Sequence, residues 1–317
     1  MRTYLLRRVG QAVVVVIGVM VLTFVMLHLE PGSAARATLG IKATPGRIAI
    51  FNSVNGLDQP LYEQFVTYVK QVCQGNLGTS YSLQQPVSTL IAQRIPRDAV
   101  LVGLSSALSL LIALPLGVGQ AMRRGGIADT VLTAVAFVLY SIPDFFFALL
   151  LISVFCVQFH LLPPEAPQAE SIAGILGDPA ALLLPVGTMT LVSFSGYSRY
   201  MRTAAIDALA QDYIRVVRAK GLPERLVLTR HVLRNSMLPV ITLLGLSAPA
   251  IVAGAVIAEE VFNYPGMGLL FFQAATSHDY PILLGSTLVV GVATVLGNLA
   301  ADIAYSRLDP RIRYANT

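Results

Sequence analysis

Residues 198–239 read SRYMRTAAIDALAQDYIRVVRAKGLPERLVLTRHVLRNSMLP and lie between two strongly apolar stretches. Eight of the 22 Lys and Arg residues of the chain are concentrated here, against three acidic residues. The stretch therefore carries a net charge of +5, which equals the formal net charge of all 317 residues. Basic residues are retained on the cytoplasmic side of membranes, so the stretch indicates a surface on that side of a bilayer.

The composition of the whole chain is typical of a membrane protein. Hydrophobic residues make up 55% of the chain and charged residues only 12%, whereas a soluble domain has about 25% charged residues. Several apolar runs reach the length of about 20 residues that a helix needs to cross a bilayer. The composition therefore predicts an all-α integral membrane protein.

Six apolar runs are long enough to be transmembrane helices. They comprise residues 9–29, 95–122, 127–160, 180–197, 237–258 and 282–304. The first run exceeds the roughly 7–15 apolar residues of a signal peptide, so we expect a retained helix. The second is expected to begin at Pro96, because Pro is favoured in a first helical turn. Pro143 is expected to kink the third.

The distribution of positive charge predicts the topology. Arg2, Arg7 and Arg8 precede the first span, which favours a cytoplasmic N-terminus. Six spans then place the C-terminus in the cytoplasm as well, and 16 of the 22 basic residues fall on that side.

The predicted regions are 1–29 (tail and first span), 30–95 (extracytoplasmic, with a helix near residues 61–72), 96–306 (core) and 307–317 (cytoplasmic tail).

The basic stretch, taken as a cytoplasmic loop over residues 198–236, predicts two helices joined by a glycine turn. Between residues 201 and 220 apolar residues recur at helical spacing: Ile206, Leu209, Ala210, Tyr213 and Val217. Gly221 would end this helix as a C-terminal cap. Pro223 and Glu224 would begin the next, since both residue types suit a first turn.

Two interpretations of this loop compete. It is either a rigid lever that fits a groove in a partner protein, or a hairpin that binds anionic lipid headgroups at about 1 kcal/mol per basic residue. A lipid anchor needs no glycine-defined turn, and Asp207, Asp212 and Glu224 would oppose it. The residues therefore favour the lever.

The sequence lacks the motifs of an ATPase or of a hydrolytic enzyme. It contains no G-x-x-x-x-G-K-[ST] segment and no Gly-Lys pair, so we expect no P-loop ATP site. No G-x-S-x-G or H-E-x-x-H segment is present, and the four His residues are not at metal-ligand spacing. We therefore expect neither an enzyme nor a metal site.

Asp144 is a charged residue within the third predicted span. Carboxylates inside membranes are candidate functional residues by default. Asp144 follows Pro143, so it could line a pathway or could cap the second half of a kinked helix. A secondary, ion-coupled transporter would need more such carboxylates near the midplane, together with paired broken helices.

At the basic loop the chain resembles the membrane-spanning subunits of ABC importers. Their hallmark is an E-A-A-x-x-x-G segment followed by I-x-L-P. The corresponding residues here are Arg215–Gly221 and His231–Arg234. In the first segment only Gly221 matches strictly, and in the second the Ile and the Pro are substituted.

The resemblance is closer to the oligopeptide/dipeptide/nickel permeases, in the subunit type with a long first outer loop. The matching segments extend over nearly the whole chain: 5–8 (LLRR), 28–32 (HLEPG), 56–61 (GLDQPL), 75–78 (GNLG), 141–143 (SIP), 211–215 (QDYIR), 218–222 (RAKGL), 230–235 (RHVLRN) with 238–239 (LP), 260–262 (EVF) with 265–268 (PGMG), 279–281 (DYP) and 308–314 (LDPRIRY).

This resemblance implies a permease subunit of an ATP-driven importer in the inner membrane of a bacterium, most simply one for peptides. It implies a second homologous permease, two ABC ATPase subunits that bind ATP and Mg, and an extracytoplasmic solute-binding protein, with no cofactor in this chain and no nucleic-acid partner. A nickel-chelate or other small-solute permease is the alternative within the family. A secondary transporter and a lipid-binding scaffold are the alternatives outside it.

The resemblance also implies two sets of site residues. The segment that couples to the ATPase comprises Asp212, Tyr213, Arg215, Arg218, Ala219, Lys220, Gly221, Leu222, Arg230, His231 and Arg234. A gate loop over residues 259–281 is expected to contribute to the outer end of the pathway. The candidate gate residues that the resemblance implies are Glu259, Glu260, Phe262, Met267 and Phe271. Asp144 is a candidate pathway residue because of its position within a span, and not through the resemblance.

Overall fold

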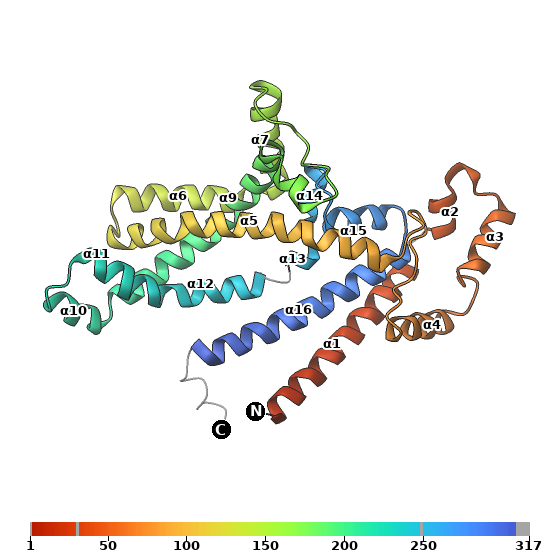
Figure 1. Cartoon of the computed structure of the whole chain (residues 1–317), viewed down its shortest axis with the longest axis horizontal. Coiled ribbons are helices and arrows are strands. Elements are labelled where there is room, and N and C mark those ends of the chain that lie inside the picture. Colours follow the sequence, from red (N-terminus) through yellow and green to blue (C-terminus); the bar gives the residue numbers. More distant parts are fainter. Residues whose placement is uncertain (1, 30–31, 248–249, 309–317) are drawn as a thin grey trace. The chain divides into compact units, whose positions relative to one another are not determined.

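The computed structural model describes residues 2–29, 32–247 and 250–308, and this part of the chain is helical and contains no strand (Figure 1). A single bridge pairs Thr79 with Pro86. The prediction of an all-α protein is confirmed. Parts of the segments 28–32 and 308–314, and most of the predicted tail, lie outside the described residues.

Three helices are long and apolar enough to cross a membrane by themselves: α5 (Val87–Met122), α9 (Pro179–Leu209) and α16 (Tyr280–Leu308). Two bent helix pairs raise the number among the described residues to as many as five. The predicted fifth span, 237–258, includes residues 248–249, which are not described. These helices are consistent with a multi-pass membrane protein. The count of six spans and the side of the membrane on which the termini lie stay predictions.

The chain divides into two compact units. The first comprises Met1–Asp98, Val252–Val256 and Pro265–Leu299, and the second comprises Ala99–Ile251, Ile257–Tyr264 and Ala300–Thr317. Helix α5 contributes its first part to one unit and the remainder to the other.

The first unit contains the predicted extracytoplasmic region. Its helices are α1 (Arg2–Leu29), α2 (Ala34–Leu39), the 3-10 turn η1 (Gly40–Lys42), α3 (Pro45–Val54), α4 (Leu61–Cys73), α15 (Met267–Thr276) and most of α16. An apolar core joins Phe24 of α1, Leu270 of α15 and Ile282 of α16. The predicted helix near 61–72 is confirmed as α4.

Tyr68 of α4 links this region to α16. Its side chain packs against the apolar core, and its hydroxyl donates a hydrogen bond to the Leu284 carbonyl at 3.3 Å. Burial raises the pKa of Tyr68 to about 12. The hydroxyl therefore stays protonated and able to donate at physiological pH.

Helix α5 begins earlier than predicted. Its first residue is Val87, and the carbonyl of Pro86 accepts hydrogen bonds from the Thr89 and Leu90 amides, so Pro96 lies inside the helix. The prediction of a start at Pro96 was wrong because residues 87–95 bury Val87 and Ile91 in the apolar core. Such tertiary burial overrides the local preference of Pro for a first turn.

In the second unit α9 is the central helix. Helices α6 (Ile127–Ser141), α7 (Asp144–Ile152) and α12 (Leu233–Ser247) all pack against it (Figure 1). The remaining elements in or partly in this unit are the π-helical η2 (Ser153–Gln158), α8 (Ile172–Leu176), α10 (Asp212–Ala219), α11 (Glu224–Leu226), the π-helical η3 (Val227–Val232), α13 (Ala250–Ala253) and α14 (Val256–Val261).

The predicted kink at Pro143 is confirmed and is a sharp bend. Ile142, which precedes Pro143, is extended with ψ 127°, as steric contact with a following proline ring requires. The helical segments Ile127–Ser141 and Asp144–Gln158 are consequently bent by 100°. The third predicted span is therefore a broken helix rather than one continuous helix.

Candidate coupling site

The basic stretch begins within α9 rather than after it. Helix α9 continues to Leu209, and α10 starts at Asp212 after Gln211, whose backbone is extended at φ −69° and ψ 142°. The prediction of one helix over residues 201–220 was wrong for this reason. The break shifts the helical phase, so that Ile214 is fully buried while Tyr213, which we expected on the apolar face, is 37% exposed.

The glycine turn is present as predicted. Gly221 has φ +76°, a conformation that side chains with a Cβ disfavour, and an added Cβ would meet no atom within 4 Å. The requirement for glycine is therefore conformational rather than steric. Pro223 is the N-terminal cap of α11, and Glu224 occupies its first turn, which confirms the predicted arrangement of helix, glycine turn and helix.

The underside of the segment is apolar and tightly packed. Ile214 of α10 and both Val227 and Val232 of η3 are fully buried. They share one apolar cluster with Ala113 of α5 and Met201 of α9. This burial packs the segment 212–232 against α5 and α9. A displacement of the segment is therefore expected to displace these two helices.

The charged residues of the segment lie on its exposed side. Arg218 spans the glycine turn and donates two hydrogen bonds to the Glu224 carboxylate, at 3.2 and 2.6 Å. Arg215 forms an exposed ion pair with Asp212 at 3.5 Å. The other predicted coupling residues are distributed as follows: Ala219, Lys220, Gly221, Arg230 and Arg234 are exposed, and Leu222 and His231 are partly buried.

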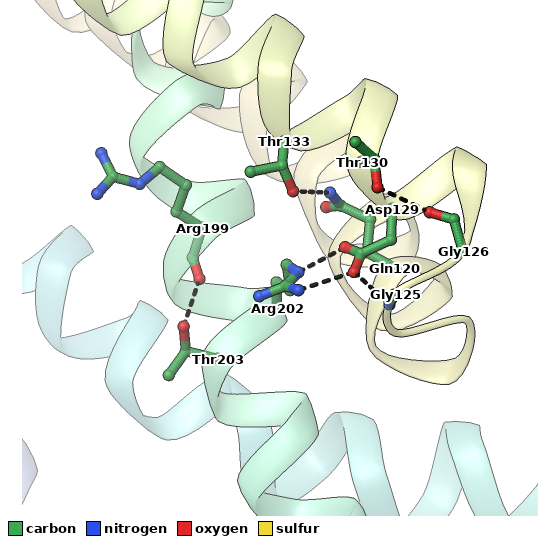
Figure 2. A network of polar contacts seen from close by, with 9 residues as sticks. All are labelled: Gln120, Gly125, Gly126, Asp129, Thr130, Thr133, Arg199, Arg202 and Thr203. Carbon is green, nitrogen blue, oxygen red and sulfur yellow. Dashed lines mark hydrogen bonds and ion pairs between the residues drawn. The ribbon is translucent and has the colours of Figure 1, made fainter.

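A buried ion pair beside this segment was not predicted. Arg202 of α9 donates two hydrogen bonds to the Asp129 carboxylate of α6, at 2.6 and 2.8 Å, and Asp129 also accepts one from the Gly125 amide at 2.9 Å (Figure 2). Asp129 is 4% exposed. The sequence shows an acid near the start of a helix and an arginine 73 positions later, and nothing in it indicates that they pair.

The helices around this ion pair approach one another closely. A Cβ at Gly117 of α5 would lie 2.8 Å from the Met201 side chain and 3.1 Å from the Arg202 amide nitrogen of α9. Gln120 of α5 also donates a hydrogen bond to Thr133 of α6 at 3.4 Å (Figure 2). The Asp129–Arg202 pair therefore lies where α5, α6 and α9 are held together.

Four of the candidate pathway and gate residues lie in the second unit. Glu259 and Phe262 are fully buried, whereas Glu260 is exposed. Asp144 is exposed in the first turn of α7, where a carboxylate is favoured by the helix dipole. This position supports the capping interpretation of Asp144.

The other two candidate gate residues are in α15 of the first unit. Met267 is buried, and Phe271 is 37% exposed. The Met267 amide donates to the Asp98 carboxylate at 2.9 Å, and Arg97 donates to the Pro265 carbonyl at 3.4 Å. Arg97 and Asp98, which we did not predict as site residues, thus fix the start of α15.

Asp279 holds the other end of α15 and was also not predicted. Its carboxylate accepts hydrogen bonds from the Ser80 hydroxyl at 2.7 Å and from the Ser82 hydroxyl and amide at 2.7 and 3.0 Å. Asp279 and Ser80 are both buried. The residues between α15 and α16 are therefore tied to the loop that the Thr79–Pro86 bridge closes.

Comparison with known proteins gives two matching sequence families. Residues 113–314 match the family described as "Binding-protein-dependent transport system inner membrane component", and residues 1–102 match the family that describes its N-terminal part. The chain is 36% identical over 316 residues to the oligopeptide transport system permease protein AppB of Bacillus subtilis, covering 99% of this chain and 100% of AppB. It is 34% identical over 314 residues to the glutathione transport system permease protein GsiC of Salmonella typhi, covering 99% of this chain and 100% of GsiC.

Proposed function

Because this chain belongs to the family of binding-protein-dependent transport system inner membrane components, we propose that it is the ABC-importer permease subunit that provides half of a translocation pathway for peptides. The two relatives named above are a permease for oligopeptides and a permease for glutathione, itself a peptide. Each match covers 99% of this chain, which supports the same substrate class here.

We place the protein in the inner membrane of a bacterium, with six spans and both termini in the cytoplasm. The charge distribution supports this orientation, since the short predicted outer loops carry no Lys or Arg. Residues 30–95 are then extracytoplasmic, residues 198–236 face the ATPases, and residues 307–317 form the cytoplasmic tail.

The observation that carries the mechanism is the path of contacts from the glycine turn to the spans. An ATPase that binds the exposed charged side of α10 and α11 displaces the buried residues of α10 and η3. The shared apolar cluster and the Asp129–Arg202 pair pass that displacement to α5, α6 and α9. ATP hydrolysis in a partner thereby changes which side of the membrane the pathway faces.

The working transporter then requires partners. We propose a second homologous permease subunit, two ABC ATPase subunits that bind ATP and Mg, and an extracytoplasmic solute-binding protein. The family's description supports the binding protein. The absence of a P-loop sequence in this chain supports a separate source of ATP hydrolysis.

Reconstitution tests this function. The chain is purified with the proposed second permease, ATPase subunits and binding protein, placed in lipid vesicles, and assayed for ATP-dependent uptake of a radiolabelled dipeptide. Uptake that continues when the ATPase subunits are left out would indicate a secondary transporter. Uptake of a nickel chelate but of no peptide would leave the permease function intact and would overturn the substrate class.

A further inference from the structure

The first unit contains a cavity of about 130 Å³ where α1, α4 and the start of α16 meet. Its lining residues come from the end of α1, the turn between α3 and α4, α4 itself, the loop 77–81 and the start of α16. Helix α4 lies beside the C-terminal end of α1 (Figure 1), where the Phe24 and Phe65 rings are in contact. The proposed topology places residues 30–95, which include α4 and the loop, on the extracytoplasmic side.

The volume of the cavity sets the size of the group that it can hold. A cavity of about 150 Å³ accommodates one benzene molecule, whereas pockets for whole ligands have about 300–1,000 Å³. The cavity of about 130 Å³ therefore fits one ring-sized side chain and is too small for a whole peptide.

The lining of the cavity is aromatic and carries no carboxylate or basic chain. The rings of Phe24, Tyr81 and Tyr280 contribute to it, and none of the described residues that line it is Lys, Arg, Asp or Glu. An ion without a partner would lose its hydration there at a high cost. Aromatic rings attract a further ring in an offset or edge-to-face arrangement. The lining therefore favours an uncharged aromatic side chain.

A chain of hydrogen bonds fixes one wall of the cavity. One ring nitrogen of His28 contacts the Phe24 carbonyl at 2.8 Å, and the other contacts the Gln64 side-chain oxygen at 3.1 Å. The Gln64 amide nitrogen donates to the carbonyls of Leu57 and Gln59, at 3.3 and 2.8 Å. These bonds tie the end of α1 to α4 and to the turn before it. The wall is thus in place before anything binds, which lowers the entropy cost of filling the cavity.

Tyr81 offers the cavity a hydrogen-bond donor. Its hydroxyl forms no hydrogen bond with any residue in the part of the chain that the structure describes, although Tyr81 lines the cavity. Burial and the nearby charge of Asp279 raise the pKa of this hydroxyl, so it stays protonated at neutral pH. An occupant with an acceptor on its ring can use this donor, and a tyrosine hydroxyl is such an acceptor.

The surface beside the cavity carries apolar side chains that the proposed topology leaves outside the spans. Val54 and Leu61, which flank the turn that lines the cavity, are 77% and 55% exposed. Apolar groups exposed together outside a membrane are typical of protein-binding surfaces, and such interfaces are anchored by a few aromatic residues that fill pockets. The family is described as binding-protein-dependent, and this binding protein is the proposed partner on that side.

We propose that the cavity receives one aromatic side chain, a tyrosine by preference, of the extracytoplasmic solute-binding protein and thereby anchors that protein on the permease. This inference rests on the proposed function and adds the place and the chemistry of one partner contact. A transported peptide fits less well, because peptides differ in their side chains and a site for one neutral ring would exclude charged ones.

The test compares two substitutions at neighbouring positions of α4. Thr67 is exposed and lines the cavity, so Thr67→Phe fills the cavity from its surface and leaves the apolar core unchanged. Val66 is 47% exposed and is not a lining residue, so Val66→Phe adds the same ring on another face of the helix and is the matched control. The complex of permease and ATPase subunits is placed in nanodiscs, and its Kd for the purified binding protein is measured. We expect Thr67→Phe to raise the Kd about tenfold or more and Val66→Phe to change it less than about twofold.

Two further measurements extend the test. Tyr81→Phe removes only the hydroxyl, and we expect about a threefold higher Kd. Replacement of the exposed tyrosines of the binding protein by alanine, one at a time, should identify one whose loss raises the Kd and adds nothing to Thr67→Phe, because both changes remove the same contact. Should Thr67→Phe fail to assemble, Gln71→Trp at a second exposed lining position of α4 and Tyr81→Phe decide the question by the same Kd.

Four results would overturn the inference. An unchanged Kd in the filling variants would exclude the contact, and an equal rise for Thr67→Phe and Val66→Phe would assign it to the surface rather than the cavity. An unchanged Kd with slower uptake of aromatic dipeptides alone would assign the cavity to the substrate. An unchanged Kd with a melting temperature that follows the lipid composition of the nanodiscs would assign it to a lipid. A wild-type complex that neither binds the binding protein nor takes up peptide with ATP would instead contradict the proposed function, before any variant is compared.

Discussion

The segment around α15 and the segment around Gly221, which the proposed topology assigns to the outer and the inner side of the membrane, are held in opposite ways. At the outer segment buried polar groups fix both ends of α15: Asp98 binds the amide of Met267, and Asp279 accepts hydrogen bonds from Ser80 and Ser82. At the inner segment the buried contacts are apolar, through Ile214, Val227 and Val232, and the ion pairs of α10 and the glycine turn are exposed.

The buried polar contacts fix the geometry of a segment, whereas the exposed charged groups are the ones that a partner protein can bind. A buried carboxylate with several donors specifies one geometry, because any shift leaves polar groups without partners. Exposed ion pairs contribute little to stability and leave charged groups free to contact another protein. The outer segment therefore has the features of a fixed element of the fold, and the inner segment those of a docking surface on a firmly packed base.

The largest expected effect comes from breaking the outer polar contacts. Asp279→Ala leaves the buried Ser80 hydroxyl without its acceptor, which costs about 1–3 kcal/mol, and removes the acceptor of Ser82, which is exposed and can bind water instead. We expect the free energy of unfolding to fall by up to about 3 kcal/mol, measured by thermal unfolding of the purified protein. Asp58→Ala, which alters an exposed acid of the same unit, is the control. Equal melting temperatures for the two variants would show that Asp279 does not fix the outer segment.

The second prediction concerns the buried ion pair at the inner end. Asp129→Asn or Arg202→Gln should destabilise the protein by about 2 kcal/mol. This is less than the roughly 3–5 kcal/mol expected when a fully buried pair is broken, because the Arg202 side chain is 27% exposed. Uptake per ATP hydrolysed by the reconstituted complex should fall several-fold. The exchanged pair Asp129→Arg with Arg202→Asp is expected to recover part of both quantities. A double variant no better than either single variant would argue against the pair as a link.

The third prediction concerns the glycine turn. Gly221→Ala places a Cβ at φ +76°, which costs about 1–2 kcal/mol, and Gly221→Asn should cost less because Asn tolerates this region. Gly221→Pro cannot adopt the conformation at all, since its ring fixes φ near −65°. We expect the loss of ATP-dependent uptake to follow the order Pro, Ala, Asn while the protein still inserts in the membrane. Uptake that is equal in all three variants would show that the turn conformation is not needed for coupling.

The sequence predicts those features of the fold that local backbone preferences decide. Period and composition predicted helices, the turn at Gly221 and the bend at Pro143, because each follows from the backbone preferences of a few adjacent residues. The break at Gln211 was not predicted, since no glycine or proline marks it. The predicted buried face of α10 was therefore shifted by one residue, to Tyr213 instead of Ile214.

The polar contacts that hold the segments were not predictable. Asp129 and Arg202, and likewise Asp279 and Ser80, are far apart in sequence and lie close together only after the helices have packed. A charged residue near a helix end in a membrane protein usually faces water. Only the packed structure distinguishes the few that are buried and paired.

The smallest effect is expected at the exposed pair that spans the turn. Arg218 and Glu224 are 45% and 47% exposed, so a double-mutant cycle with Arg218→Ala and Glu224→Ala should give a coupling energy of about 0.2–1 kcal/mol that declines with salt. Charge reversal by Arg218→Glu should nevertheless reduce binding of the ATPase subunits in pull-downs, because the segment presents this charge outward. A coupling energy near that of a buried pair would place Arg218 in the fold rather than on the docking surface, and the contrast between the two segments would then be lost.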